Sequence, residues 1–266
     1  MLDHLAPERG AFSHALDWAL HVRSCIHGIS LPAWTVAEQA EADCAGACRR
    51  LHVPWELSRG HEHLAASITE MVRPAELFVF GQALAPAQKK ALLRPAMHNG
   101  GPAILVCPDS WSPLHRVLVV DEGRRSNDRF LGFAAELAGW FQAKAMVLTV
   151  ARSERAARRR QRSAREALGS RGQEADFDLV VGSAVPAAVA NVARWRRCQL
   201  VVMERHERRP WWPWAASSTT ETLMELPHDL TLLALPQSGI PETASERPPA
   251  ASLLPHPGFD AGPLGM

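Results

Sequence analysis

The most constraining feature of this sequence is an internal repeat: the order of segments in residues 12–108 returns in residues 127–236. An amphipathic segment with the three-to-four spacing of one buried helix face opens each copy, in residues 12–22 and again in residues 127–137. Self-similarity of this kind indicates that one structural unit is present twice.

Strand-like runs follow the opening helix in both copies. An apolar run ends in Thr-Val at Val36 and at Val150, and each copy closes on an apolar run that ends in proline, at Pro108 and Pro236. Short apolar runs alternating with helices are typical of parallel strands covered by helices on both faces. We therefore predict an α/β protein with two tandem Rossmann-like domains, each a parallel sheet flanked by helices.

The repeat also sets the domain boundaries. The two units are expected at residues 1–109 and 114–237, joined by a turn-rich stretch. Residues 238–266 are rich in proline, glycine and serine and have little periodicity, which predicts a disordered tail.

Composition narrows the function classes. The formal net charge is +1, so no global electrostatic attraction draws the chain to nucleic acid. The arginine-rich segment in residues 151–172 lacks interleaved aromatic residues and is read as a solvated helix. No apolar run approaches the roughly 18–20 residues of a membrane span, and no leader pattern opens the chain. We expect a cytoplasmic protein that contacts neither nucleic acid nor membrane.

The sequence shows no arrangement of residues that predicts catalysis. Its five cysteines are scattered, which favours reduced thiols over a disulfide framework, and no histidine or cysteine set has metal-ligand spacing. No Ser/His/Asp or Cys/His pattern is indicated by spacing either. We therefore expect a protein that is not an enzyme and holds no metal.

Three stretches of the second copy carry a family resemblance. The run "RVLVV" is followed directly by Asp121, and Ser126 comes a few residues later, ahead of a helix-like segment. Later come "CQLVVME", ending at Glu204, and "SSTTETLMELPHDLTLLALP", ending at Pro236. With these features residues 115–236 resemble a universal stress protein domain, and the first copy resembles one more faintly. The resemblance implies five parallel strands in the order 3-2-1-4-5, and two halves packed through their last strands. Two such chains can then pair as a homodimer.

Nucleotide-binding members of that family carry the motif G-x2-G-x9-G-[S/T], where glycines let the backbone approach phosphates at a helix N-terminus. In this chain the three glycine positions hold Glu204, Glu207 and Ser217, and Ser218 takes the last position. The carboxylates repel phosphate, and the added side chains obstruct close backbone approach. In the first copy Gly81 is kept, but the other glycine positions hold Leu84 and Arg94, and Pro95 replaces the hydroxyl residue.

The resemblance therefore implies a vestigial nucleotide site, formed by Asp121, Val150, Gly182, Ser217, Ser218 and Thr219. Asp121 is placed either on a nucleotide ribose or as the cap of the turn after its strand. No cofactor is expected, and the preferred function is a stress-response or regulatory role through protein contacts or self-association. The alternative is a sensor that holds ATP or AMP in a relaxed site. The tryptophan-rich segment in residues 210–214 is either an interface or a cover over the vacated pocket.

The first copy lacks room for its first strand, which the resemblance places at the centre of the sheet. Only Met1 and Leu2 precede Asp3, the counterpart of Asp121. A gap in a buried sheet leaves backbone groups without partners, at about 1–3 kcal/mol each. We expect either a true start upstream of Met1, or a first sheet whose second strand pairs directly with its fourth.

Overall fold

The computed structural model describes residues 10–30, 38–59, 77–81, 101–122, 128–182, 185–205, 223 and 230–236. The predicted tail and the segment in residues 206–222 lie outside the described residues. The domain boundaries in residues 1–109 and 114–237 are untested and stay predictions.

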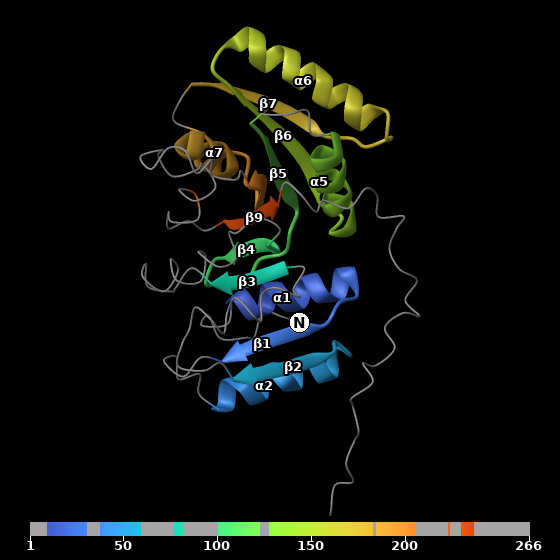
Figure 1. Cartoon of the computed structure of the whole chain (residues 1–266), viewed down its shortest axis with the longest axis vertical. Helices are drawn as coiled ribbons and strands as arrows, with labels where there is room; N and C mark the ends of the chain where they lie inside the picture. The colour runs from blue at the N-terminus through green and yellow to red at the C-terminus, as the bar shows by residue number, and fades with distance from the viewer. Residues whose placement is uncertain are drawn as a thin grey trace, which may run out of the picture.

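A seven-stranded sheet in the order β3-β4-β9-β8-β5-β6-β7 forms the centre of the molecule. Figure 1 shows this sheet with β7 at one edge and β3 at the other. Its strands are β3 (Leu77–Gly81), β4 (Ala103–Cys107), β5 (Arg116–Asp121), β6 (Lys144–Ala151), β7 (Asp176–Val181), β8 (Leu200–Arg205) and β9 (Thr231–Pro236).

The second half has the predicted topology. Its five strands lie in the order β7-β6-β5-β8-β9, which is 3-2-1-4-5 in chain order, and all four pairs are parallel. Helices α5 (Asp128–Trp140) and α6 (Glu154–Gly169) lie across the sheet from α7 (Val185–Trp195), as Figure 1 shows. The predicted α/β fold, a mostly parallel sheet flanked by helices, is confirmed.

Alternating side chains of β5 divide the core into two layers. Leu118 and Val120 belong to the layer that contains Val189 of α7, whereas Val117 and Val119 belong to the layer beneath α5 and α6. This alternation follows from the two-residue period of a strand, and continuous apolar character lets β5 be buried on both faces.

The two halves join through their closing strands. β4 pairs with β9 in the only antiparallel ladder among the described strands, with Leu105 opposite Leu233. Both residues are fully or almost fully buried, so the joint is part of the core. The predicted packing of the halves through their last strands is confirmed, and it joins β3 and β4 of the first half to the sheet of the second half.

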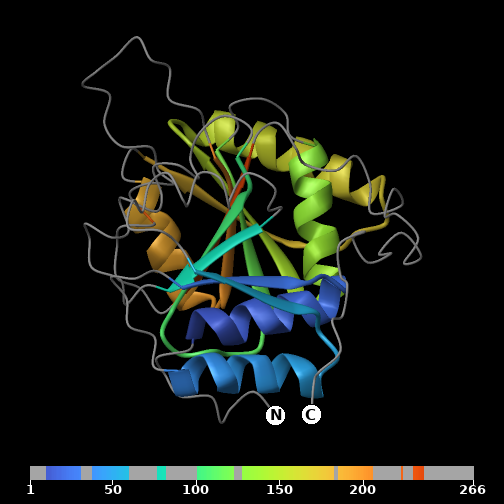
Figure 2. The same cartoon turned by 60° about the horizontal axis from the view of Figure 1, so that its bottom comes forward.

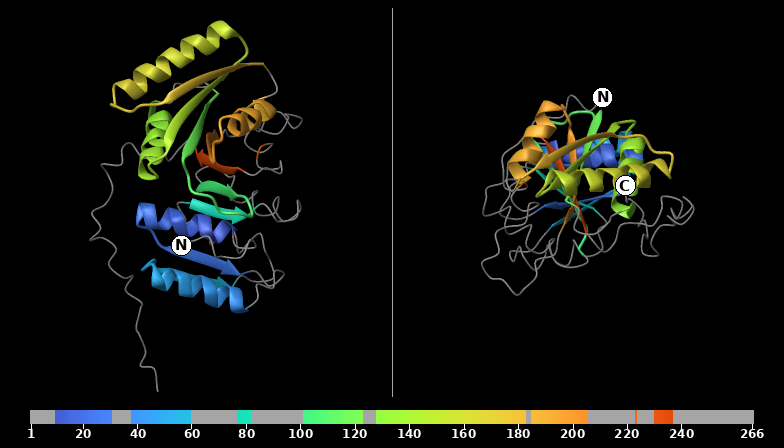
Figure 3. Two further views of the ribbon diagram at one scale, coloured as in Figure 1. Left: turned by 180° about the vertical axis from the view of Figure 1, so that it is seen from behind. Right: turned by 90° about the horizontal axis from the view of Figure 1, so that it is seen from above.

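Among the described strands, the first half lacks the direct pairing that was expected between its second and fourth strands. β1 (Ile26–Ser30) and β2 (Trp55–Arg59) form a separate two-stranded parallel sheet, and β1 is not paired with β3. Figure 3 shows this small sheet standing apart from the large one. The prediction that the second strand of this half pairs directly with its fourth is therefore wrong.

The position of α1 (Gly10–Val22) explains why β1 of the small sheet and β3 of the large sheet stay apart. α1 contacts β3 and β4 as well as β1, and in Figure 2 it lies along the same side of the small sheet as α2 (Glu38–Arg50). Leu16 is buried in a cluster with α2, whereas Trp18 is buried in the large core. Because α1 buries residues in both clusters, it bridges the two sheets without bringing their strands into register.

Four helices of the described residues end in the same way. α1, α2, α5 and α7 are each followed by a non-glycine residue with φ between 53° and 55°: Arg23, His52, Gln142 and Arg197. The next residue then donates its amide to a carbonyl in the last turn, as Ala143 does to Ala138 at 2.8 Å. This is the geometry of a Schellman cap.

Candidate functional site

The carboxyl edge of the second-half sheet is where this topology places ligands. From β5 the chain moves through β6 to β7 on one side, while β8 and β9 lie on the other side. In open α/β sheets, ligands bind outside the carboxyl ends of the strands where the order reverses. Here that point lies between β5 and β8.

Two acidic residues stand at that point. Val120 of β5 is the register partner of Met203 of β8, and the residues that follow them are Asp121 and Glu204. Both are half-buried. Neighbouring parallel strands are roughly 4.8 Å apart. Two acidic residues therefore lie on adjacent strands at the edge where a Rossmann-like fold receives an anionic group.

Val150, also predicted to belong to the site, lies in β6 and has its backbone acceptor occupied. Arg160 of α6 donates from Nη1 to the carbonyl of Val150 at 3.0 Å and to the carbonyl of Glu122 at 2.9 Å. One guanidinium thus connects the carboxyl ends of β5 and β6. Sequence reasoning treated the arginine-rich helix as solvated and missed this residue, which differs from its neighbours only by facing the sheet.

Gly182 follows β7 with a φ of +152°, a conformation that favours glycine. Its amide donates to the carbonyl of Ala151 at 3.1 Å, and a Cβ built on it would meet nothing within 4 Å. The backbone conformation therefore explains the glycine at this position, whereas close packing against another group does not.

Arg205 closes β8 and is buried, with 4% of its surface exposed. Its guanidinium donates from Nη1 to the carbonyl of Pro102 and from Nη2 to that of Gly101, both at 3.2 Å. These carbonyls precede β4, so Arg205 ties the second half to the first. The sequence pattern predicts no such role for this arginine, and its position at the end of an apolar strand is the one available signal.

The structure thus brings Asp121, Val150 and Gly182 to one edge of the sheet. Ser217, Ser218 and Thr219 lie outside the described residues, as do Glu207 and the tryptophan-rich segment. The vestigial site as a whole therefore stays a prediction.

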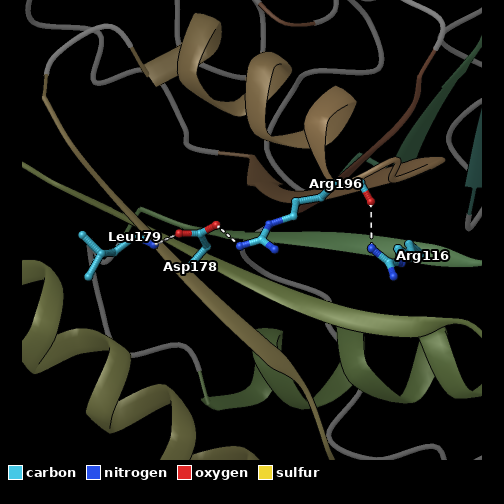
Figure 4. Close-up of polar contacts among 4 residues, drawn as sticks. All are labelled: Arg116, Asp178, Leu179 and Arg196. Atoms are coloured by element: carbon cyan, nitrogen blue, oxygen red, sulfur yellow. Dashed lines mark hydrogen bonds and ion pairs between the residues drawn. The ribbon is translucent and has the colours of Figure 1, made fainter.

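The amino edge of the same sheet carries a second polar cluster, shown in Figure 4. Arg196 donates to the Asp178 carboxylate at 2.8 Å, and Arg116 donates to the Arg196 carbonyl at 3.1 Å. A cavity of about 580 Å³ opens beside the cluster, lined by His115, Arg116, Trp195, Arg196, Arg197 and Gln199. Gln199 accepts from the backbone amides of both His115 and Arg116. These contacts connect β5, β7 and the segment before β8.

The described residues contain neither a metal-binding cluster nor a membrane-spanning helix. No three or more histidine, cysteine or acidic side chains are grouped to hold a metal ion there. No helix in this part of the chain has the length and apolar character of a membrane span. The five cysteines are free thiols, and burial raises the pKa of Cys107 and Cys198.

Comparison with known proteins identifies the fold. No family model and no curated protein matches the sequence. Among solved structures, a universal stress protein from Archaeoglobus fulgidus DSM 4304 matches at a TM-score of 0.64 and 13% identity, over 89% of this chain and 96% of that one. A putative universal stress protein from Pseudomonas aeruginosa UCBPP-PA14 matches at 0.62 and 16%, over 84% and 88%.

The chain therefore has the fold of the universal stress proteins, over most of its length. A functionally unknown protein from Pseudomonas aeruginosa PAO1 shares it, at a TM-score of 0.60 and 16% identity over 84% of this chain and 88% of that chain. The resemblance inferred from the sequence is confirmed for the fold.

Proposed function

We propose that the chain is a non-enzymatic stress-response or regulatory protein of the universal stress protein type, which acts through protein contacts and has a degenerate nucleotide site. Glu204, which stands beside Asp121 at the switch point and replaces the first glycine of the nucleotide motif, carries the proposal. A nucleotide phosphate placed there meets like charge, which costs on the order of 1–4 kcal/mol at protein-surface dielectrics.

Two arginines near this pair do not reverse the effect, because the structure commits them elsewhere. Arg160 donates to backbone carbonyls at the ends of β5 and β6, and Arg205 donates to carbonyls ahead of β4. Recruiting either guanidinium to a phosphate breaks hydrogen bonds that hold the carboxyl edge. Buried carbonyls that lose their partners cost about 1–3 kcal/mol each.

The alternative function is an adenine-nucleotide sensor. One observation favours it: the Thr149 hydroxyl is buried and has no hydrogen-bond partner among the described residues, one position before Val150. A bound ATP or AMP is the kind of polar ligand that satisfies such a group. The sensor keeps Asp121 as the ribose-binding residue that the family resemblance implies.

Native mass spectrometry of protein purified without added nucleotide separates the two functions. The proposal predicts the mass of the bare chain, and a retained mass of ATP or AMP contradicts it. The matched variant is Glu204→Gly with Glu207→Gly and Ser217→Gly, which restores the three glycines of the motif. We expect this variant to gain ATP affinity by at least about tenfold, which corresponds to about 1.4 kcal/mol.

A further inference from the structure

The β3 edge, which we define as Leu77–Gly81, is an open edge of the large sheet among the described strands. β3 pairs with β4 on one side, and β1 pairs only with β2. Unpaired edges present rows of backbone donors and acceptors that template the addition of another strand.

Comparison of the two halves shows which strand belongs beside β3. The counterparts of β1 and β3 in the second half are β6 and β8, and both of those pair with β5. No described strand holds the position of β5 in the first half. The arrows of β1 and β3 point the same way in Figures 1 and 3, so one strand parallel to both completes the repeat.

The chemistry of that strand follows from the two core layers. Phe78 and Phe80 belong to the layer of Leu118 and Val120, whereas Leu77 and Val79 pack against the layer of Val117 and Val119. A strand added at the β3 edge therefore continues both layers. It needs apolar side chains on both faces, as β5 has in its four buried central residues.

The β3 edge also lacks the protection that the opposite edge has. β7 carries Asp176 and Asp178 in its six residues, and charged side chains on an edge strand discourage pairing with another chain. β3 reads Leu-Phe-Val-Phe-Gly and has no charge. The two edges of the same sheet thus differ in their capacity to accept a strand.

We propose that the β3 edge binds an extended segment of a partner protein whose central residues are apolar, which adds to the sheet as a parallel strand in the position of β5. Backbone hydrogen bonds supply the affinity, and apolar side chains on both faces supply the selectivity. The inference rests on the proposed function in one respect: it names the surface that makes the protein contacts.

The test uses hydrogen exchange of the full chain with a peptide that carries the β5 sequence, His115–Arg125 (HRVLVVDEGRR). We expect exchange at Leu77–Gly81 and Ile26–Ser30 to slow by about tenfold at saturating peptide, with β7 unchanged as the internal control. The same peptide with Val119→Pro loses a ladder donor and is expected not to protect either strand.

Three results overturn the inference: no protection by the β5 peptide, equal protection of β7, or equal protection by the proline peptide. Amides of β3 and β1 that are already protected in the free chain also overturn it, because the chain then covers this edge itself. Failure here is distinguishable from failure of the proposed function, since nucleotide binding is measured without the peptide.

Discussion

The guanidinium of Arg160 donates a hydrogen bond from Nη1 to the carbonyl oxygen of Val150, at 3.0 Å. The same nitrogen reaches the Glu122 carbonyl at 2.9 Å. A helix residue thus holds together the ends of two parallel strands at the edge where the fold places ligands. The contact fixes the carbonyls of Val150 and Glu122 at that edge.

Substituting Arg160 with alanine tests this brace. We expect Arg160→Ala to lower the free energy of unfolding by about 1–2 kcal/mol, because two half-buried carbonyls lose a charged donor. The control is Arg158→Ala on the same helix, whose pair with Glu154 is 70% and 62% exposed and should contribute less than about 0.5 kcal/mol. Equal effects of the two variants in urea unfolding would contradict the brace.

Arg205 is expected to contribute more than Arg160 to the free energy of unfolding, because Arg205 is buried. Arg205→Met keeps much of the side-chain volume and leaves the carbonyls of Gly101 and Pro102 without this donor, so unfolding should become easier by about 2–3 kcal/mol. Arg194→Met, at an exposed position of α7, serves as the control and should stay within about 0.5 kcal/mol. A loss under 0.5 kcal/mol for Arg205→Met would show that the tie between the halves is unimportant for stability.

Residue patterns predicted much of the fold. Apolar runs such as Val117–Val120 are buried on both faces, so their composition alone indicates a central strand. The sequence also indicated which strands close each half, because Leu105 and Leu233 lie in continuous apolar runs. The prediction failed at the first-half gap, where the bridging position of α1 is a tertiary effect that local patterns do not encode.

The candidate site was less predictable for a similar reason. Asp121, Val150 and Gly182 follow strands, and parallel strands bring their carboxyl ends together, so their shared edge was foreseeable. The role of Arg160 was not foreseeable, because several other arginines of α6 have the same local context, and for Arg205 the only signal was its position at the end of an apolar strand. Which guanidinium turns toward a free carbonyl depends on the packing of helix against sheet.

Stability is expected to depend on the protonation of His14. Burial lowers its pKa from 6.5 to about 4, against a smaller opposing effect of a hydrogen bond with the Ser110 backbone. The unfolded chain therefore binds a proton more readily. The contribution of neutral His14 to the free energy of unfolding is fully present above pH 6.5. It falls by roughly 3 kcal/mol as the pH drops to 4.

The variant His14→Leu isolates this effect. Burial raises the pKa of Asp17, one turn away. Protonation of this carboxyl at low pH therefore favours the folded state, and it does so in both proteins. Urea unfolding at several pH values should show a steeper loss between pH 6.5 and 4 in the wild type than in His14→Leu. Parallel curves for the two proteins would contradict the assignment.

A residue with positive φ at a helix C-terminus offers a stabilising substitution. Gln142 is exposed and has a φ of 53°, so glycine at this position removes backbone strain at the cost of greater freedom in the unfolded chain. We expect Gln142→Gly to raise the free energy of unfolding by about 0.5–1 kcal/mol. Gln142→Ala keeps the strain and should give no gain; a gain equal to that of glycine would refute the explanation.

The most direct test of the central claim is equilibrium dialysis of the wild-type chain against labelled ATP and AMP. With a carboxylate at Glu204 in place of the first motif glycine and both nearby guanidinium groups engaged, the account predicts no saturable binding of either nucleotide below about 1 mM, a free energy weaker than about −4.1 kcal/mol. Saturable one-to-one binding of either nucleotide with a micromolar Kd would contradict the account.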